Sequence, residues 1–136
     1  MVIWLRLYLL KNITQKGDPL NLSVSIIDST GHISIPTRTA IPIGLIVNEI
    51  ATNAIKHGFT EEGEAVFTVE LWKETSENQY VLRISNTGRP FPENINLDNP
   101  DTLGLQLISA LVNQLDGTIE LKRTPHPVFT IWFPVD

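Results

Sequence analysis

The feature that most constrains this chain is an apolar-periodic stretch, residues 43–59, that predicts one amphipathic helix. Its apolar residues recur three and four positions apart, so they share one face of a helix. A helix with one apolar face must bury that face against another layer of secondary structure. Pro42, just before the stretch, is expected in the first helical turn, where its missing N–H removes no hydrogen bond.

The other face of this predicted helix carries a chemically specific set of side chains. Glu49, Asn53 and His57 recur every four positions, and Thr52 and Lys56 lie alongside them. A carboxylate and an amide oxygen suit a hard cation such as Mg²⁺, whereas Lys with His suits phosphate. This combination indicates a nucleotide site. Taken alone, the pattern is also compatible with an ordinary solvated helix face.

The rest of the chain predicts further strands and helices of ordinary length. Strands are expected at 20–27, 32–35, 65–73, 79–85, 118–123 and 128–133, and further helices at 2–15 and 103–115. A chain of 136 residues is one domain of usual size. The order α-ββ-α-ββ-α-ββ predicts an α+β two-layer sandwich, with a mixed, mostly antiparallel sheet and helices on one face.

A long loop rich in Pro, Gly and Asn, residues 86–101, connects the strand expected at 79–85 to the helix expected at 103–115. Loops of this length are usually functional or disordered. It opens with the turn sequence Asn86-Thr87-Gly88 and ends at Thr102-Leu103-Gly104-Leu105, where a helix is expected. Thr102 is suited to be the N-cap of that helix, and the free N–H groups of a helix start favour anions. No P-loop glycine-lysine motif and no Rossmann glycine triplet occurs.

Charge and cysteine content exclude several classes of function. The net charge of −5 argues against a nucleic-acid-binding surface, which needs a dominant basic patch. The absence of cysteine excludes disulfides, thiolate zinc sites and a thiol nucleophile. The apolar N-terminal segment is interrupted by Arg6 and is too short to span a bilayer, so we expect a helix that packs against the core or against a partner.

Three motifs carry a resemblance to a known family. Residues 41–59 resemble the N box of sensor histidine kinases of the second-type (HWE-like) subgroup, residues 102–117 its second glycine box, and residues 131–134 its closing strand. The chain therefore resembles the ATP-binding domain of a sensor histidine kinase, with the Bergerat (GHKL) fold. The resemblance implies an ATP-binding catalytic domain over residues 17–136, preceded at 1–16 by a helix from an upstream dimerisation and phosphoacceptor domain.

The resemblance also implies roles for individual residues. Asn53 would coordinate the Mg²⁺ that bridges the ATP phosphates, with Glu49 in its shell, while Lys56 and His57 would contact phosphate. Glu49, Asn53 and Lys56 form the implied catalytic set. The implied cofactor-binding set is Asn53, Lys56, His57, Asn86, Gly88, Thr102, Leu103, Gly104 and Leu105. Simpler interpretations stay open: an exposed carboxylate at Glu49, a solvated pair at Lys56 and His57, and a turn glycine at Gly88.

The chain departs from the family pattern at the adenine end. Asn86 stands where the family has Asp, which removes a charge-assisted hydrogen bond and is expected to weaken ATP binding by roughly 1–2 kcal/mol. Pro90 stands where the family has glycine, and His126-Pro127 replaces a Gly-Thr pair. The Mg²⁺ and phosphate end carries the expected residues.

The implied function is transfer of the γ-phosphoryl group of ATP to a histidine on a separate domain of the same parent chain. The parent would be a homodimer that signals indirectly to a response regulator, and this domain would be cytoplasmic whether or not the parent is attached to a membrane. Loop residues 89–101 would form a lid over the nucleotide. Two alternatives stay open: a degenerate module used for protein–protein docking, and an anti-sigma-type serine kinase of the same fold.

Overall fold

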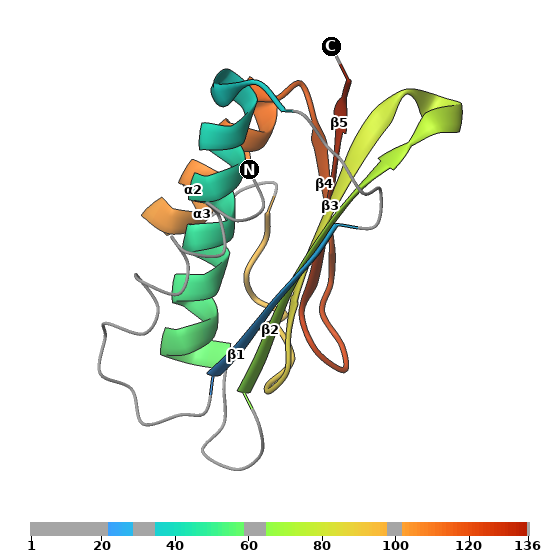
Figure 1. Ribbon diagram of the computed structural model, residues 1–136. Coiled ribbons are helices and arrows are strands. Elements are labelled where there is room, and N and C mark those ends of the chain that lie inside the picture. Colours follow the sequence, from blue (N-terminus) through green and yellow to red (C-terminus); the bar gives the residue numbers. More distant parts are fainter. Residues whose placement is uncertain (1–21, 29–34, 59–64, 98–101, 136) are drawn as a thin grey trace.

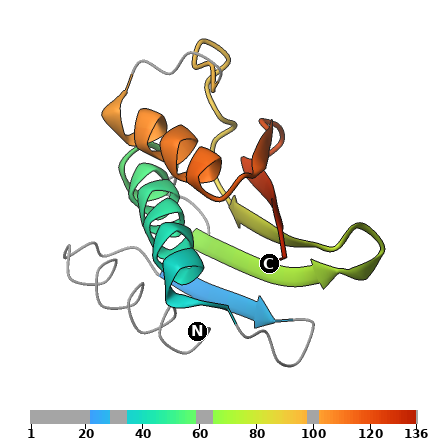
Figure 2. The ribbon, with the colours of Figure 1, turned by 90° about the horizontal axis from the view of Figure 1, so that it is seen from above.

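The structure is a computed structural model that describes residues 22–28, 35–58, 65–97 and 102–135. Helices α2 (Thr37–Asn53) and α3 (Leu103–Gln114) cover one face of a five-stranded sheet (Figure 1). The view from above shows both helices on the same side of the strands (Figure 2). The predicted α+β two-layer sandwich is confirmed. The helix expected at 2–15 and the strand expected at 32–35 lie outside the described residues, except for Ile35, which precedes α2 without strand pairing.

The sheet is mixed, as expected. Its strands are β1 (Leu22–Asp28), β2 (Ala65–Glu74), β3 (Gln79–Asn86), β4 (Thr118–Lys122) and β5 (Val128–Pro134), in the spatial order β1-β2-β3-β5-β4. β1 pairs with β2 in parallel, and the remaining pairs are antiparallel. Because β3 and β5 are antiparallel neighbours, the end of β3 lies beside the start of β5, with Ser85 opposite Val128.

The hydrophobic core lies between the sheet and the helices. On β5, alternate residues are buried because successive strand residues point to opposite faces of the sheet. On α2, buried residues recur at helical spacing, as the sequence predicts. The core residues are Ile43, Ile46, Val47, Ile50, Ala51, Ala54, Phe67, Val69, Leu71, Leu82, Ile84, Leu105, Ile108, Leu111, Val112, Phe129, Ile131 and Phe133.

The start of α2 differs from the prediction. The helix begins at Thr37, so Pro42 is its sixth residue and is buried in its interior instead of its first turn. Pro36 takes the position before the helix, where its carbonyl accepts hydrogen bonds from the N–H groups of Thr39 and Ala40. Pro42 therefore does remove one helical hydrogen bond, and its ring packs on the buried face in exchange. The apolar period did not extend into the polar residues 37–39, and this hid the first turn of the helix.

The end of the same helix agrees with the prediction in position and differs in geometry. Helical backbone continues to Gly58, but Ala54–Gly58 form a π-helical turn. Single π turns are rare and are often found at functional sites. None of the helices within the described ranges is long and apolar enough to cross a bilayer.

Candidate functional site

A cavity of about 480 Å³ opens between the C-terminal part of α2, the start of α3 and the loop that follows β3. The sheet contributes Asn86 at the end of β3 and Phe129 near the start of β5. The lining residues are Glu49, Ile50, Thr52, Asn53, Ala54, Lys56, Asn86, Arg89, Pro90, Phe91, Pro92, Ile95, Thr102, Gly104, Leu105, Pro127 and Phe129. The cavity thus joins both motifs that the sequence singled out, although they are far apart along the chain.

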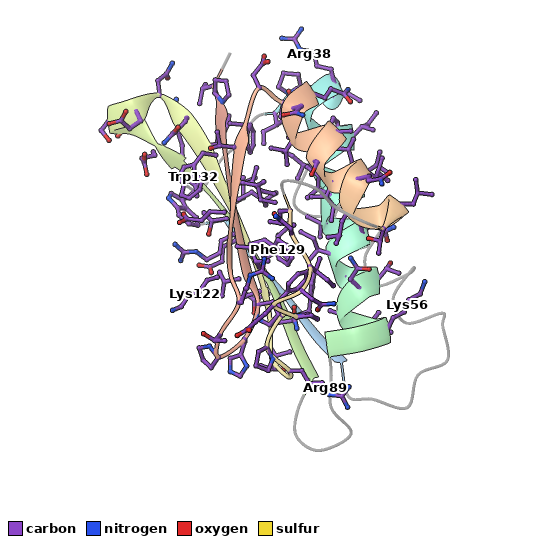
Figure 3. The ribbon with its side chains drawn as sticks, turned by 180° about the vertical axis from the view of Figure 1, so that it is seen from behind. Arg38, Lys56, Arg89, Lys122, Phe129 and Trp132 are labelled. Atoms are coloured by element: carbon purple, nitrogen blue, oxygen red, sulfur yellow. The ribbon has the colours of Figure 1, made fainter. Side chains whose placement is uncertain are left out.

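The polar face of α2 supplies one wall. Glu49 and Asn53 are half-buried and one helical turn apart, and Lys56 is exposed beyond them. Thr52 also lines the cavity, but its hydroxyl donates to the carbonyl oxygen of Asn48 at 2.8 Å. Figure 3 shows Lys56 at the end of α2 and Arg89 on the loop after β3, at the same end of the molecule. Both cations line the cavity, together with the carboxylate of Glu49, so its charged lining carries two positive groups and one negative group.

The N-terminus of α3 supplies the facing wall. Thr102 is its N-cap, as predicted, and its hydroxyl oxygen accepts a hydrogen bond from the Leu105 N–H at 3.3 Å. Gly104 makes a close approach to α2 possible, because a Cβ at that position would lie 3.0 Å from Glu49 Oε2. The glycine therefore brings a helix N-terminus, with its free N–H groups, next to the carboxylate of α2.

The Thr102 cap gives a prediction about stability. We expect Thr102→Ala to lower the free energy of unfolding by about 1 kcal/mol, because the Leu105 N–H loses its acceptor at the start of α3. Thr102→Ser keeps the hydroxyl and should stay within about 0.5 kcal/mol of the wild type. Urea denaturation followed by circular dichroism measures both. Equal stability of the Ala and Ser variants would show that the cap contributes nothing.

Asn86 also lines the cavity and is the buried polar residue among the described residues, 5% exposed. Its amide nitrogen Nδ2 donates to the carbonyl oxygen of Thr87 at 3.0 Å. A carbonyl can only accept, so this contact fixes which way the amide is turned. Because Nδ2 is used in this contact, the amide oxygen Oδ1 is the atom with which Asn86 can accept a hydrogen bond from a ligand.

Several cavity residues were missed by the sequence analysis. Phe91 and Phe129 meet edge to face, with ring centroids 5.7 Å apart, and with Pro92 and Ile95 they make this end of the cavity apolar. Figure 3 shows Phe129 between the sheet and the helices, whereas Trp132 lies on the other face of the sheet. The alternation of β5 places Phe129 on the inner face, but the loop residues have no periodicity that predicts their direction.

Three residues of the predicted site are not among those that line the cavity. Leu103 is 81% exposed at the start of α3. Gly88 has φ of 113°, a conformation that favours glycine, which supports its simpler interpretation as a turn residue. The side chain of His57 lies outside the described part of the chain. The remaining residues of that set, Glu49, Asn53, Lys56, Asn86, Thr102, Gly104 and Leu105, are brought together around the cavity.

Residues 38–136 match the family model described as histidine kinase-, DNA gyrase B-, and HSP90-like ATPase. The chain belongs to this ATPase family. The match includes all of the cavity-lining residues. Membership implies ATP binding, and a cavity lined by apolar rings and by two cations fits such a ligand.

Relatives of this ATPase-family chain are histidine kinases. It is 30% identical over 91 residues to blue-light-activated histidine kinase 2 of Erythrobacter litoralis, and 29% identical over 79 residues to sensor histidine kinase PdtaS of Mycobacterium tuberculosis. These regions cover 67% and 57% of this chain, but only 26% and 16% of the relatives.

The fold is also similar to that of a histidine kinase. The histidine kinase domain of the Erythrobacter litoralis EL346 blue-light-activated histidine kinase superimposes with a TM-score of 0.77 at 25% identity, covering 96% of this chain and 60% of that one. The ATPase-family chain therefore has the fold of a histidine kinase catalytic domain. These likenesses do not favour the docking-module or serine-kinase alternatives.

Proposed function

We propose that this chain is the ATP·Mg²⁺-binding catalytic domain of a two-component sensor histidine kinase. One observation carries the proposal: a single cavity is lined by the buried residue Asn86, by apolar rings, by a capped helix N-terminus and by an exposed lysine. Such a cavity suits a ligand with a flat, hydrogen-bonding base at one end and anionic groups at the other.

The base end favours adenine among the purines. The Asn86 amide oxygen is an acceptor, so it pairs with the 6-amino group of adenine and repels the 6-oxo group of guanine. The Thr87 carbonyl opposes a flip of the amide, because a flipped Asn86 would place two acceptor oxygens against each other. The apolar rings of Phe91 and Phe129 would exclude water from this hydrogen bond.

The phosphate end combines two sources of positive potential. The first turn of α3, with Thr102, Gly104 and Leu105 at the cavity, offers backbone N–H groups to anionic oxygens. Lys56 adds a mobile point charge from α2. Gly104 keeps a side chain out of this approach, which agrees with its close packing against Glu49.

The donors on α2 fit Mg²⁺ held together with a nucleotide. Asn53 supplies an amide oxygen and Glu49 a carboxylate, both of which suit a hard cation. Within the described ranges, no group of three or more His, Cys, Asp or Glu side chains could hold a metal ion. The ion would therefore take its remaining ligands from phosphate oxygens and water, as is usual for Mg²⁺.

The proposed chemistry is phosphoryl transfer. Bound ATP would supply the γ-phosphoryl group, which passes to an imidazole nitrogen of a histidine on a separate domain and leaves ADP. The residues of this chain would position the triphosphate and neutralise its charge, with Glu49, Asn53 and Lys56 nearest the reacting group. The acceptor histidine, the homodimeric parent and the response regulator belong to this proposal, because the chain spans about a quarter or less of the curated relatives it matches.

Calorimetric titration of the full chain with non-hydrolysable ATP and GTP analogues, with and without Mg²⁺, tests the proposal. We expect Mg²⁺-dependent binding of the ATP analogue and at least about tenfold weaker binding of the GTP analogue, because the latter meets an acceptor at Asn86. Asn86→Asp should tighten the ATP analogue by no more than about tenfold, because the restored charge-assisted bond is partly offset by a carboxylate oxygen that faces the Thr87 carbonyl in place of the Nδ2–H donor.

Two results would contradict this expectation. Absence of heat from the folded wild type would remove the nucleotide site and support the docking-module alternative. Equal affinity for the two analogues would show that the Asn86 amide is not held by Thr87 in the orientation described.

A further inference from the structure

The apolar wall of the cavity is built from a loop with little regular pairing of its own. Residues 87–97 follow β3, and Phe91 and Ile95 from this segment line the cavity. Inside this segment, the Ile95 N–H donates a long hydrogen bond to the Pro92 carbonyl, at 3.4 Å. The position of Phe91 and Ile95 must therefore be set from outside the segment.

Arg123, directly after β4, makes the contacts that set it. Its guanidinium donates to the carbonyl oxygen of Pro92 through Nη1 at 2.5 Å and to that of Ile95 through Nη2 at 2.6 Å. The same guanidinium carbon lies 5.5 Å from the centre of the Phe91 ring. The side chain thus holds two carbonyls and one ring of the loop at once, although Arg123 itself does not line the cavity.

Backbone contacts complete the attachment of this loop to the β4–β5 connection. The Phe91 N–H donates to the Arg123 carbonyl at 3.0 Å, so the residue is joined to the loop through both side chain and main chain. His126 Nδ1 lies 3.1 Å from the Gly88 carbonyl oxygen and, because a carbonyl only accepts, must be the donor there. Phe91 then meets Phe129 of β5.

We propose that Arg123 is a positioning residue for the nucleotide base. It does not touch the ligand; it fixes the loop that carries Phe91 and Ile95, so that Phe91 stays edge to face against Phe129 in the apolar wall. The planar guanidinium is suited to this task, because it can donate to two separate carbonyls and lie over a ring, which a lysine ammonium cannot do in one geometry. The inference rests on the proposed nucleotide site.

The test compares Arg123→Ala and Arg123→Lys with Arg83→Ala in the full chain. Arg83 is a matched control, because its guanidinium carbon also lies 4.9 Å from a ring centre, that of Trp72, and it does not line the cavity. Calorimetry measures the affinity for a non-hydrolysable ATP analogue with and without Mg²⁺. Hydrogen exchange followed by mass spectrometry measures the protection of residues 91–97.

We expect Arg123→Ala to weaken the analogue by about tenfold, since the base must then order the wall on binding. The factor by which Mg²⁺ tightens binding should stay at its wild-type value, because the phosphate end is unchanged. Exchange over 91–97 should rise in Arg123→Ala, rise less in Arg123→Lys, and stay as in the wild type in Arg83→Ala.

Three results would overturn the inference. The first is wild-type affinity in Arg123→Ala. The second is an equal loss in Arg83→Ala, and the third is a collapse of the Mg²⁺ factor, which would place the damage at the phosphate end. Failure of the wild type itself to bind the analogue is a different result, because it would remove the proposed function and the positioning role together.

Discussion

Asn53→Ala is expected to weaken binding of a non-hydrolysable ATP analogue by about 100-fold in the presence of Mg²⁺, which corresponds to ~2.7 kcal/mol. The substitution removes the amide oxygen that we assign to Mg²⁺, and the described part of the chain has no cluster of carboxylates to replace it. Without Mg²⁺ the variant and the wild type should bind with nearly equal affinity. Calorimetric titration under both conditions measures the difference.

Asn48→Ala is the matched control for this experiment. Asn48 is a half-buried asparagine of the same helix, and it does not line the cavity. Its main-chain carbonyl, which accepts from Thr52, is retained in the variant. We expect wild-type affinity and wild-type Mg²⁺ dependence. If the two variants lose affinity equally, the loss at Asn53 comes from damage to α2 and not from the metal ligand.

Gly117→Ala is expected to lower the free energy of unfolding by about 2–3 kcal/mol. A Cβ at this position would lie 2.6 Å from the Trp132 carbonyl oxygen and 3.4 Å from both Phe133 Cβ and the Val112 carbonyl oxygen. The first of these atoms belongs to the backbone of β5, so it cannot turn away. Either the end of α3 or the central sheet must shift. Urea denaturation at equilibrium measures the change.

Gly104→Ala is the control that separates this steric effect from the general effect of replacing glycine. There the added Cβ meets the far end of the flexible Glu49 side chain at 3.0 Å, and alanine favours the helical backbone. We expect the free energy of unfolding to change by less than about 1 kcal/mol. A Gly117→Ala variant as stable as Gly104→Ala would mean that β5 accommodates the methyl group.

The sequence predicted the layers of this fold because its apolar periods are regular. The spacing of Ile43, Ile46, Val47 and Ile50 is visible without coordinates, and these residues are buried as expected. The first turn of α2 escaped prediction because residues 37–39 are polar and because Pro42 stands where prolines at helix starts usually do. The π turn at 54–58 escaped because no side-chain pattern distinguishes it from the α-helix that it continues.

The polar end of the site was predictable for the same reason. Glu49, Asn53 and Lys56 share a helix face, and Thr102 precedes an apolar run as N-caps do. The apolar part of the site was not predictable. Phe91 and Ile95 lie in a loop whose path is set by contacts with Arg123, about thirty residues further along the chain. A single sequence carries no signal for such a long-range contact within irregular backbone.

The hydrogen bond between the Asn86 amide and the Thr87 carbonyl has a consequence for how base preference could change during evolution. The group that opposes the flip is part of the peptide bond, which every residue type at position 87 retains. A substitution at position 87 can change the proposed base preference only if it displaces this main-chain carbonyl. If Asn86 binds the base as proposed, a lineage or an engineered library that changes its preference toward a 6-oxo base would need a substitution at Asn86 itself, and substitutions at position 87 would leave the preference in place.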